Sequence, residues 1–236
     1  YGVPQMRWRT FILGLRGKTL PPSSFPEPVC HAPIRPNFTT MFNGHSLVKS
    51  PSPETDARFT TVEDAIGDLP PLQNGESGLP VKGYAGPPAC DYQKRARVGT
   101  VGVVNHEAPK LSPINMQRLH YIRQGGNWTD IPDNLLPKGM QRARKSDHTK
   151  RYGRVDPKGL ASTILTKCDP HWGAYFHYSQ DRSFTVREAA RIQSFPDHFI
   201  FIGTQGQQFA QVGNAVPPLL AEAVGLALKS ILEEGF

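Results

Sequence analysis

Residues 184–196 read FTVREAARIQSFP, and residues 211–218 read QVGNAVPP. Thr185 and Glu188 have the spacing of a capping box, in which each side chain bonds the backbone N–H of the other residue, so they predict the start of a helix. That helix should end before Pro196, because proline cannot continue it. Pro217 and Pro218 favour the start of another helix. These two blocks decide the fold.

Apolar residues continue beyond the second block with helical spacing, at Leu220, Val224, Ala227, Leu228 and Ile231. This stripe predicts a C-terminal helix with one face that must be buried. At the other end, Thr10–Leu15 reads TFILGL, an apolar run typical of a strand covered on both faces. Residues 161–166 are also β-favouring. We therefore expect an α/β fold.

Between these ends the chain is rich in turn-forming residues, with 22 Gly and 23 Pro in 236 residues. Residues 61–66 predict a short helix, because Thr61 and Asp64 form a weaker capping box. Met116, Leu119 and Ile122 have near-helical spacing over two turns. The rest of residues 72–155 is expected to be mostly loop.

The formal net charge is +7, and it is unevenly distributed. Residues 94–158 contain 14 Lys or Arg and 5 Asp or Glu, a charge of +9, which leaves −2 for the remainder. A basic segment in a near-neutral chain is typical of binding to a polyanion such as nucleic acid. Taken alone, the charge is equally consistent with a solvated surface.

Three cysteines, Cys30, Cys90 and Cys168, are widely spaced and form no CxxC pair, so no zinc site is predicted. Their number favours a reducing, intracellular compartment. Cys30 and His31 could start a metal site, but a thiol beside a surface imidazole is the preferred interpretation. No run approaches the roughly 20 apolar residues of a membrane span, so no membrane partner is expected.

A third block, QMRWR at residues 5–9, completes a pattern with the first two. In this order and separation the three resemble the QxRxR, TxREAARxQxFP and GNAVPP motifs of DNA cytosine-5 methyltransferases. The chain is therefore similar to the C-terminal portion of that family. The resemblance implies the C-terminal part of a Rossmann-like, S-adenosylmethionine-dependent methyltransferase domain, into which a loop-rich DNA target-recognition domain is inserted.

The family's reaction implies roles for residues in the block at 5–9. A cysteine thiolate adds to C6 of a cytosine that is flipped out of double-stranded DNA, and a methyl group passes from S-adenosylmethionine to C5. The resemblance assigns to Arg9 the holding and polarising of the cytosine, with Arg7 beside it and Gln5 supporting the turn. The alternative for both arginines is a surface position flanking a strand.

Other positions are expected to contact DNA or cofactor. Thr163 matches a threonine that touches the DNA backbone, a contact that positions DNA without reading its sequence; the alternative is a strand threonine with no such role. Phosphate contacts are expected from Arg142, Arg144 and Lys145. The turn Asn214, Ala215 and Val216 matches the border of the S-adenosylmethionine pocket, or is simply a turn before a helix.

Arg187 and Glu188 match a motif that is chiefly architectural. We expect Glu188 to cap its helix and Arg187 to brace that helix against the sheet. The resemblance further divides the chain into residues 1–16, the last strand region of the catalytic domain; residues 17–180, the target-recognition region with its basic core at about 94–158; and residues 181–236, which return to the catalytic domain.

The family's earlier motifs are not found: a glycine-rich F-x-G-x-G loop, a Pro-Cys-Gln nucleophile loop and a Glu-Asn-Val segment. Three explanations remain open: a fragment of a longer polypeptide, one subunit of a split enzyme, or a non-catalytic DNA-binding relative. We expect the nucleophile in an N-terminal catalytic half, on the same polypeptide or a separate subunit, and this chain alone to be inactive. A bacterial, cytoplasmic, DNA-associated protein is the expected setting.

Overall fold

The computed structural model describes residues 1–9, 11–16, 20, 24–31, 41–42, 45–46 and 58–233. The chain divides into two compact units. The first unit comprises Tyr1–Val3, Trp8–Phe59 and Val216–Phe236, and the second comprises Pro4–Arg7 and Thr60–Ala215. Each is described by itself. The domain boundaries at residues 16/17 and 180/181 come from motifs and not from contacts, and they stay a prediction.

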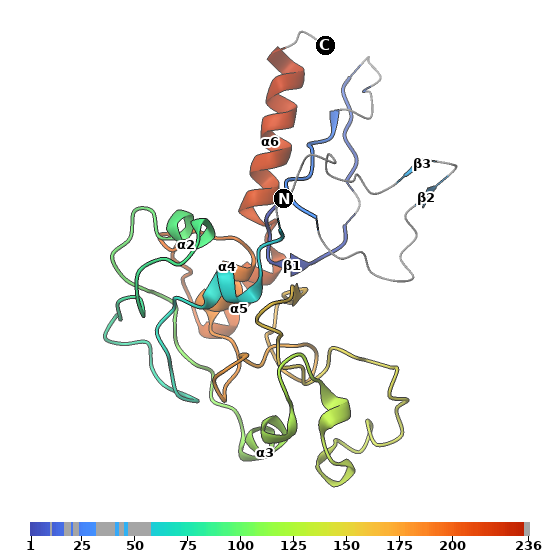
Figure 1. Cartoon of the computed structure of the whole chain (residues 1–236), viewed down its shortest axis with the longest axis vertical. Coiled ribbons are helices and arrows are strands. Elements are labelled where there is room, and N and C mark those ends of the chain that lie inside the picture. Colours follow the sequence, from blue (N-terminus) through green and yellow to red (C-terminus); the bar gives the residue numbers. More distant parts are fainter. Residues whose placement is uncertain are drawn as a thin grey trace. The chain divides into compact units, whose positions relative to one another are not determined.

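The second unit contains five α-helices among its described residues (Figure 1). They are α1 (Val62–Ile66), α2 (Asp91–Ala96), α3 (Pro113–Tyr121), α4 (Val186–Ile192) and α5 (Gln205–Asn214), with the 3-10 helices η2 (Trp128–Asp130) and η3 (Asp133–Leu135). Strands β1 (Gln5–Met6) and β4 (Ala161–Ser162) pair in parallel, with Gln5 opposite Ala161. The β-favouring run at 161–166 is thus strand only at its first two residues.

Both predicted capping boxes are formed. In α1 the backbone N–H of Asp64 donates to Thr61 Oγ1 at 3.1 Å, and the N–H of Thr61 donates to the Asp64 carboxylate at 2.9 Å. In α4 the same exchange joins Thr185 and Glu188 at 3.1 and 2.8 Å. These bonds satisfy backbone donors that a helix start leaves unpaired. Helix α4 ends at Ile192, before Pro196, as predicted.

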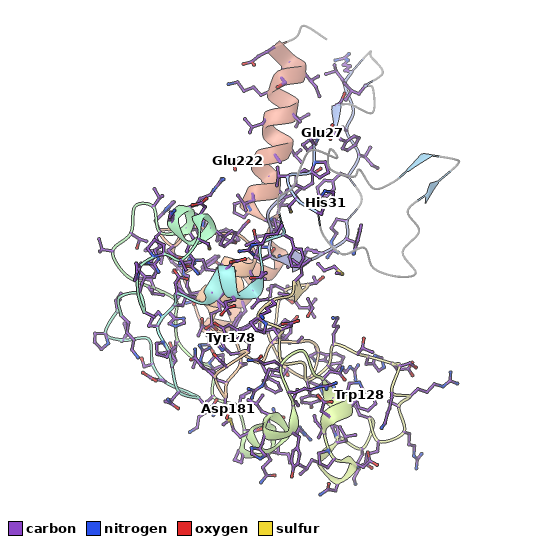
Figure 2. The ribbon with its side chains drawn as sticks, viewed as in Figure 1. Glu27, His31, Trp128, Tyr178, Asp181 and Glu222 are labelled. Atoms are coloured by element: carbon purple, nitrogen blue, oxygen red, sulfur yellow. The ribbon has the colours of Figure 1, made fainter. Side chains whose placement is uncertain are left out.

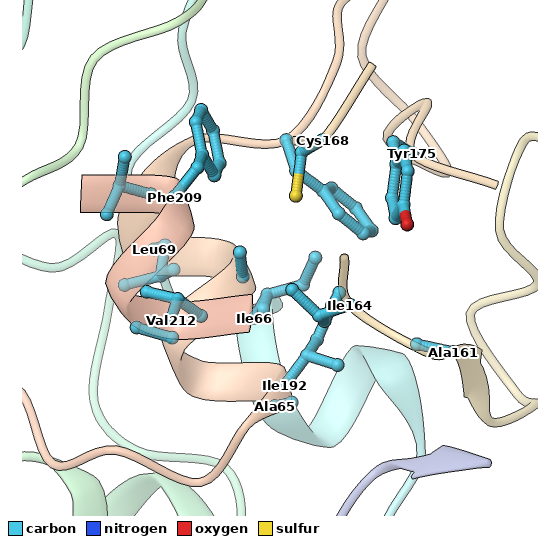
Figure 3. Packing of buried hydrophobic residues seen from close by; sticks show 14 of the residues in the cluster. Ala65, Ile66, Leu69, Ala161, Ile164, Cys168, Tyr175, Ile192, Phe209 and Val212 are labelled. Carbon is cyan, nitrogen blue, oxygen red and sulfur yellow. The ribbon is translucent and has the colours of Figure 1, made fainter. Parts of the chain in front are cut away.

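The main core of the second unit lies between α1, α4 and α5, which pack against one another. Figure 3 shows Phe209 and Val212 of α5 in the same core as Ile66 of α1 and Ile192 of α4. Residues from the segment after β4, among them Ile164, close the other side. This core holds two motif blocks, 184–196 and 211–218, against the segment that follows β4.

A second core forms around α3, which confirms the helical spacing noted at residues 116–122. Leu119 and Ile122 are buried there with Trp128, Tyr152 and Phe176, and Met116 packs against them. The large aromatic side chains supply much of the buried apolar area of a loop-rich segment. The loops of this region are therefore anchored on a core of their own.

The first unit contains β2 (Met41–Phe42) and β3 (His45–Ser46), which pair antiparallel, and α6 (Pro218–Glu233). Helix α6 begins at Pro218, as predicted, and Ile231 of its apolar stripe is buried. The strand predicted over 10–15 is not formed in the described residues 11–16, where only Leu15 makes an isolated bridge. Ile12 is 90% exposed, whereas such a strand is stabilised by neighbours that cover both faces.

The stretch Gln205–Glu233 contains an 18-residue window with a mean hydropathy of 1.5, which is apolar and long enough to cross a membrane; this corrects the expectation that no such stretch exists. The criterion concerns length and composition only. Within it, Pro217 separates α5 from α6, because it cannot continue the first helix. Phe209 and Val212 of α5 are buried in the core of the second unit, whereas 11% of the apolar window is buried.

Candidate functional site

Gln5, Arg7 and Thr163, three predicted site residues, meet where β1 and β4 end. The Thr163 hydroxyl donates to the carbonyl of Met6 at 3.0 Å. Arg7 Nη1 donates to the carbonyl of Ile164 at 3.0 Å, and the Gln5 side-chain oxygen accepts from the N–H of Ile164 at 3.3 Å. The two segments are thus joined by side chains as well as by the short ladder.

The buried Gln5 amide extends this junction to the other two motif blocks. Its Nε2 donates to Gln193 Oε1 at 2.5 Å, and Gln193 Nε2 donates to the carbonyl of Val212 at 2.8 Å. An amide suits both positions because it donates and accepts at once. Gln193 was not singled out by sequence reasoning, although it stands inside the block 184–196. The junction therefore ties all three motif blocks to residues 163–165.

Tyr175 braces the same segment from the core side. Its hydroxyl donates to the carbonyl of Thr163 at 3.0 Å and accepts from the N–H of Leu165 at 3.2 Å. Burial raises the pKa of Tyr175 above its ordinary range, so the hydroxyl keeps its proton. No sequence motif marks Tyr175. Its role follows from a tertiary contact alone.

The block 211–218 approaches this segment through Gly213. A Cβ at Gly213 would lie 2.4 Å from the carbonyl carbon of Leu165 and 2.5 Å from the nitrogen of Thr166, so only glycine fits. Asn214, the last residue of α5, is exposed and borders an open depression of about 660 Å³. The other lining residues are Ile202, Gly203, Gln207, Ala210 and Gln211.

The remaining members of the predicted cofactor turn and base pocket lie outside this junction. Ala215 is half-buried in the second unit, while Val216 belongs to the first unit and is 57% exposed. Arg9 also belongs to the first unit; it is exposed, and its Nη1 donates to the carbonyl of Trp8 at 2.6 Å. Gln5, Arg7 and Thr163 therefore lie together in the second unit, and Arg9 belongs to the first unit.

Arg142, Arg144 and Lys145 lie on an exposed, turn-rich segment, residues 137–151. Within the described part of the chain, no ion pair includes any of these three cations. The segment is anchored by Trp128, whose indole N–H donates to the carbonyl of Asp147 at 3.1 Å; Figure 2 labels Trp128 in this region. Unpaired, exposed cations on an anchored segment are available to an anionic partner.

Glu188 caps α4, as predicted, and also pairs with Arg182 through two hydrogen bonds of 2.8 and 2.6 Å. Burial alone would raise the pKa of Glu188, but the charge and hydrogen bonds of Arg182 lower it below its ordinary range. Arg187 braces loops and not a sheet, which corrects the expectation: it donates to the carbonyls of Val104, Pro196 and Phe199. Glu188 and Arg187 therefore both have structural roles.

Arg191, in the same block, is the centre of a buried ionic group. It makes two 2.6 Å bonds to the Asp197 carboxylate and a 3.1 Å bond to Asp68. Arg97 pairs with Asp68 as well, at 2.6 Å. Such pairs add little net stability, but removal of one partner leaves a buried charge uncompensated. The group holds residues 196–197 against the end of α1.

The three cysteines are free thiols that differ in burial. Among the described residues, no three His, Cys, Asp or Glu side chains gather as metal ligands. Cys168 is buried in the main core, and burial raises its pKa, so it is a neutral thiol and therefore a poor nucleophile. Cys30 and Cys90 are half-buried free thiols.

Comparison with known proteins shows the family to which the chain belongs. The model of the C-5 cytosine-specific DNA methylases matches residues 1–230. The chain belongs to this family. It is 36% identical over 254 residues to DNA (cytosine-5)-methyltransferase 1A of Oryza sativa subsp. japonica, covering 99% of this chain and 16% of the relative. It is 32% identical over 229 residues to the type II methyltransferase M1.HphI of Haemophilus parahaemolyticus, covering 97% and 45%.

The methylase fold is supported by a solved structure. A prophage-encoded E. coli protein, assigned as a DNA modification methyltransferase, superimposes with a TM-score of 0.53 at 22% identity, over 75% of this chain and 49% of its own. This likeness shows the fold alone. The chain spans 16% of the length of the first plant relatives and 45–50% of the bacterial type II relatives.

Proposed function

We propose that this chain is the C-terminal part of a DNA cytosine-5 methyltransferase. It would recognise a sequence in double-stranded DNA and hold a flipped cytosine while a methyl group moves from S-adenosylmethionine to C5. The observation that carries the proposal is the hydrogen-bonded junction of Gln5, Thr163 and Gln193, because it joins all three family motifs at one place. Family membership over residues 1–230 supports it.

Within this proposal, the residues of the first motif divide their work. Arg9 has an exposed guanidinium that can donate to the carbonyl oxygen of a cytosine and stabilise charge that develops on the ring. Arg7, which is bonded to the carbonyl of Ile164, positions the loop that carries Arg9. The Thr163 hydroxyl donates its one proton to the carbonyl of Met6. To contact the DNA backbone it would turn that proton to a phosphate oxygen, because phosphate oxygens accept hydrogen bonds and do not donate them.

The cofactor of the proposed reaction is S-adenosylmethionine, which supplies the methyl group when bound. The residues at the end of α5 fit one wall of its site: Asn214 offers an exposed amide to the polar amino-acid end, and the depression beside it is largely apolar. Ala215 continues this wall in the proposal, and Val216, which belongs to the first unit, is proposed as a further cofactor contact. Gly213 keeps the wall close to residues 165–166.

The nucleophile is proposed to lie in an N-terminal catalytic half, on the same polypeptide or a partner chain. Cys30, Cys90 and Cys168 lack the Pro-Cys-Gln context of the family. Residues 17–180 would then form the target-recognition region, with Arg142, Arg144 and Lys145 on DNA phosphates. By analogy with the type II relatives, the setting would be restriction and modification in a bacterial cytoplasm.

A methylation assay tests the proposal. We expect the chain alone to transfer no labelled methyl group from S-adenosylmethionine to DNA, and we expect transfer once a polypeptide with the Pro-Cys-Gln half is added. Activity of the chain alone would disprove the missing-nucleophile part. DNA binding without activity in either sample would favour the alternative, a non-catalytic DNA-binding or regulatory relative.

A further inference from the structure

Trp172 is a tryptophan that the fold leaves largely in solvent. Its side chain is 55% exposed, whereas Trp128 of the neighbouring core is 3% exposed. Exposure of so large an aromatic surface is unfavourable unless a partner covers it. Trp172 lies on the loop at residues 165–173, which also carries exposed Lys167 and begins two residues after Thr163. This exposure indicates that the loop binds a partner.

The indole is held in place by its neighbours. The Arg151 guanidinium lies over the ring, 4.8 Å from its centroid, and the His171 ring meets it edge-on at 4.8 Å. His171 is fixed in turn by a 2.9 Å hydrogen bond to the hydroxyl of Tyr152, which is buried in the second core. The Trp172 side chain is thus exposed and ordered at the same time.

The backbone of the loop is pinned as well. The N–H of Tyr152 donates to the carbonyl of Pro170 at 2.6 Å, and the N–H of Trp172 donates to the carbonyl of Asp169 at 2.9 Å. A Cβ at Gly173 would lie 2.5 Å from the ring of Tyr175, so the loop sits tightly on the tyrosine that braces Thr163 and Leu165. An immobile loop loses little entropy when it binds.

The charge around the loop points to an anion. Arg151 stands over the indole, and Lys150 and Lys167 are exposed nearby in the sequence. The carboxylate of Asp169 is engaged by the N–H of His171 at 2.9 Å. An aromatic face with cations beside it binds an unstacked base and its phosphate, because the base stacks on the ring and the phosphate is neutralised; the base flipping of the proposed function opens the stack and so supplies such a base.

We propose that Trp172 is a base-contacting residue of the DNA site, and that Arg151 is the positioning residue that orients the indole and faces a phosphate. This inference rests on the proposed function, since it assumes that the chain binds DNA. It goes further by naming the side chain that meets a base. Trp172 has no role in any of the three sequence motifs.

The test measures duplex binding by the intact protein, by fluorescence anisotropy of labelled DNA. Trp172→Ala should weaken binding about 5- to 100-fold, the range of one base–aromatic stack, and Trp172→Phe should weaken it less. Tyr121→Ala is the matched control, because Tyr121 is 49% exposed but lies on α3, where its ring meets the His120 ring edge-on. Its binding should change less than about twofold.

Intrinsic fluorescence supplies a readout that a merely structural role would not move. DNA should quench the wild-type emission, and Trp172→Phe should lower that quenching to the part contributed by Trp8 and Trp128, while its thermal unfolding midpoint stays near the wild-type value. If wild type binds DNA and Trp172→Ala binds equally well, the inference is wrong and the proposed function stands. If wild type fails to bind any duplex, both are wrong.

Discussion

At the scale of single residues, the family motifs divide into side chains that face solvent and side chains that hold the fold. Arg9 is exposed, whereas Arg187 and Arg191 are completely buried, and Gln5 and Gln193 are bonded to each other inside the protein. The buried members are satisfied by carbonyls, carboxylates and amides, as buried polar groups must be. Only the exposed members are free to serve the chemistry directly.

The Arg9 side chain is expected to act on the reaction more than on binding. In the completed enzyme, Arg9→Ala should lower the rate of methyl transfer by about 100-fold or more, the usual cost of losing one charge-stabilising donor, with a much smaller loss of DNA affinity. Single-turnover methylation and equilibrium DNA binding measure the two effects. Equal losses in both would contradict the role given to Arg9.

His177 should make the stability of the second unit depend on pH. Burial lowers the pKa of His177 to about 4, against an ordinary value of 6.5. The unfolded state therefore binds more protons between these values, so stability is full above pH 6.5 and falls as the pH drops towards 4. The loss should be on the order of 3 kcal/mol in the free energy of unfolding.

Urea unfolding across pH 7 to 4 measures this dependence. His177→Asn keeps an acceptor for the N–H groups of Ser179 and Gln180, and it should flatten the profile. The buried His106, whose pKa is also lowered by burial, should leave a smaller dependence of stability on pH in this variant. His120→Asn, on the surface, should leave the profile as in wild type; an unchanged slope in His177→Asn would exclude His177 as its source.

At the scale of elements, α5 is positioned by close backbone contact. Gly213 lies so near Leu165 that a methyl group has no room, whereas a Cβ at Gly206 of the same helix would meet nothing within 4 Å. Helix α5, which lines the depression at Asn214, therefore packs directly against the segment after β4. A substitution at Gly213 tests that contact, and the same substitution at Gly206 is its control.

Gly213→Ala should lower the free energy of unfolding by about 1–3 kcal/mol, because the added methyl overlaps backbone atoms that cannot turn aside. Gly206→Ala should be neutral or stabilise by up to about 1 kcal/mol through helix propensity. Thermal unfolding of the two variants provides the measurement. Similar stability changes in both would show that the contact of Gly213 with Leu165 is not tight.

At the scale of the whole molecule, the excess positive charge is concentrated in residues 94–158, which contain 14 Lys or Arg and 5 Asp or Glu. Many of these cations are already used: Lys94 pairs with Asp91 and Arg154 with Asp181, which Figure 2 labels. Arg142 and Arg144 are exposed on the segment 137–151. The location of a cation, and not the net charge, decides whether it is available to DNA.

Binding to DNA should therefore weaken steeply with salt, and the slope should depend on which cations are removed. The double variant Arg142→Ala/Arg144→Ala should reduce the slope of log K against log salt by about 2. The matched double variant Lys82→Ala/Lys94→Ala removes cations that pair with Glu76 and Asp91, and its slope should stay near wild type. Binding titrations at four salt concentrations distinguish the two.

Helix starts were predictable because they depend on neighbours in the chain. The capping boxes at Thr61 and Thr185 are exchanges between residues three apart, and both are formed. The strand over residues 10–15 could not be settled in this way, because a strand is stabilised by partners elsewhere, and Ile12 is exposed here. Local bonds can be inferred from the order of residues, but pairing partners cannot.

The sequence by itself determined the family, the caps of α1 and α4, and the residues that carry the motifs. Only the tertiary structure decided that Gln5 meets Gln193 across 188 residues, that Tyr175 braces Thr163, and that Trp172 stays exposed. The physical reason is that hydrogen bonds between distant segments, and the burial of charges such as Arg191, depend on how the cores close. Composition alone would place that arginine on the surface.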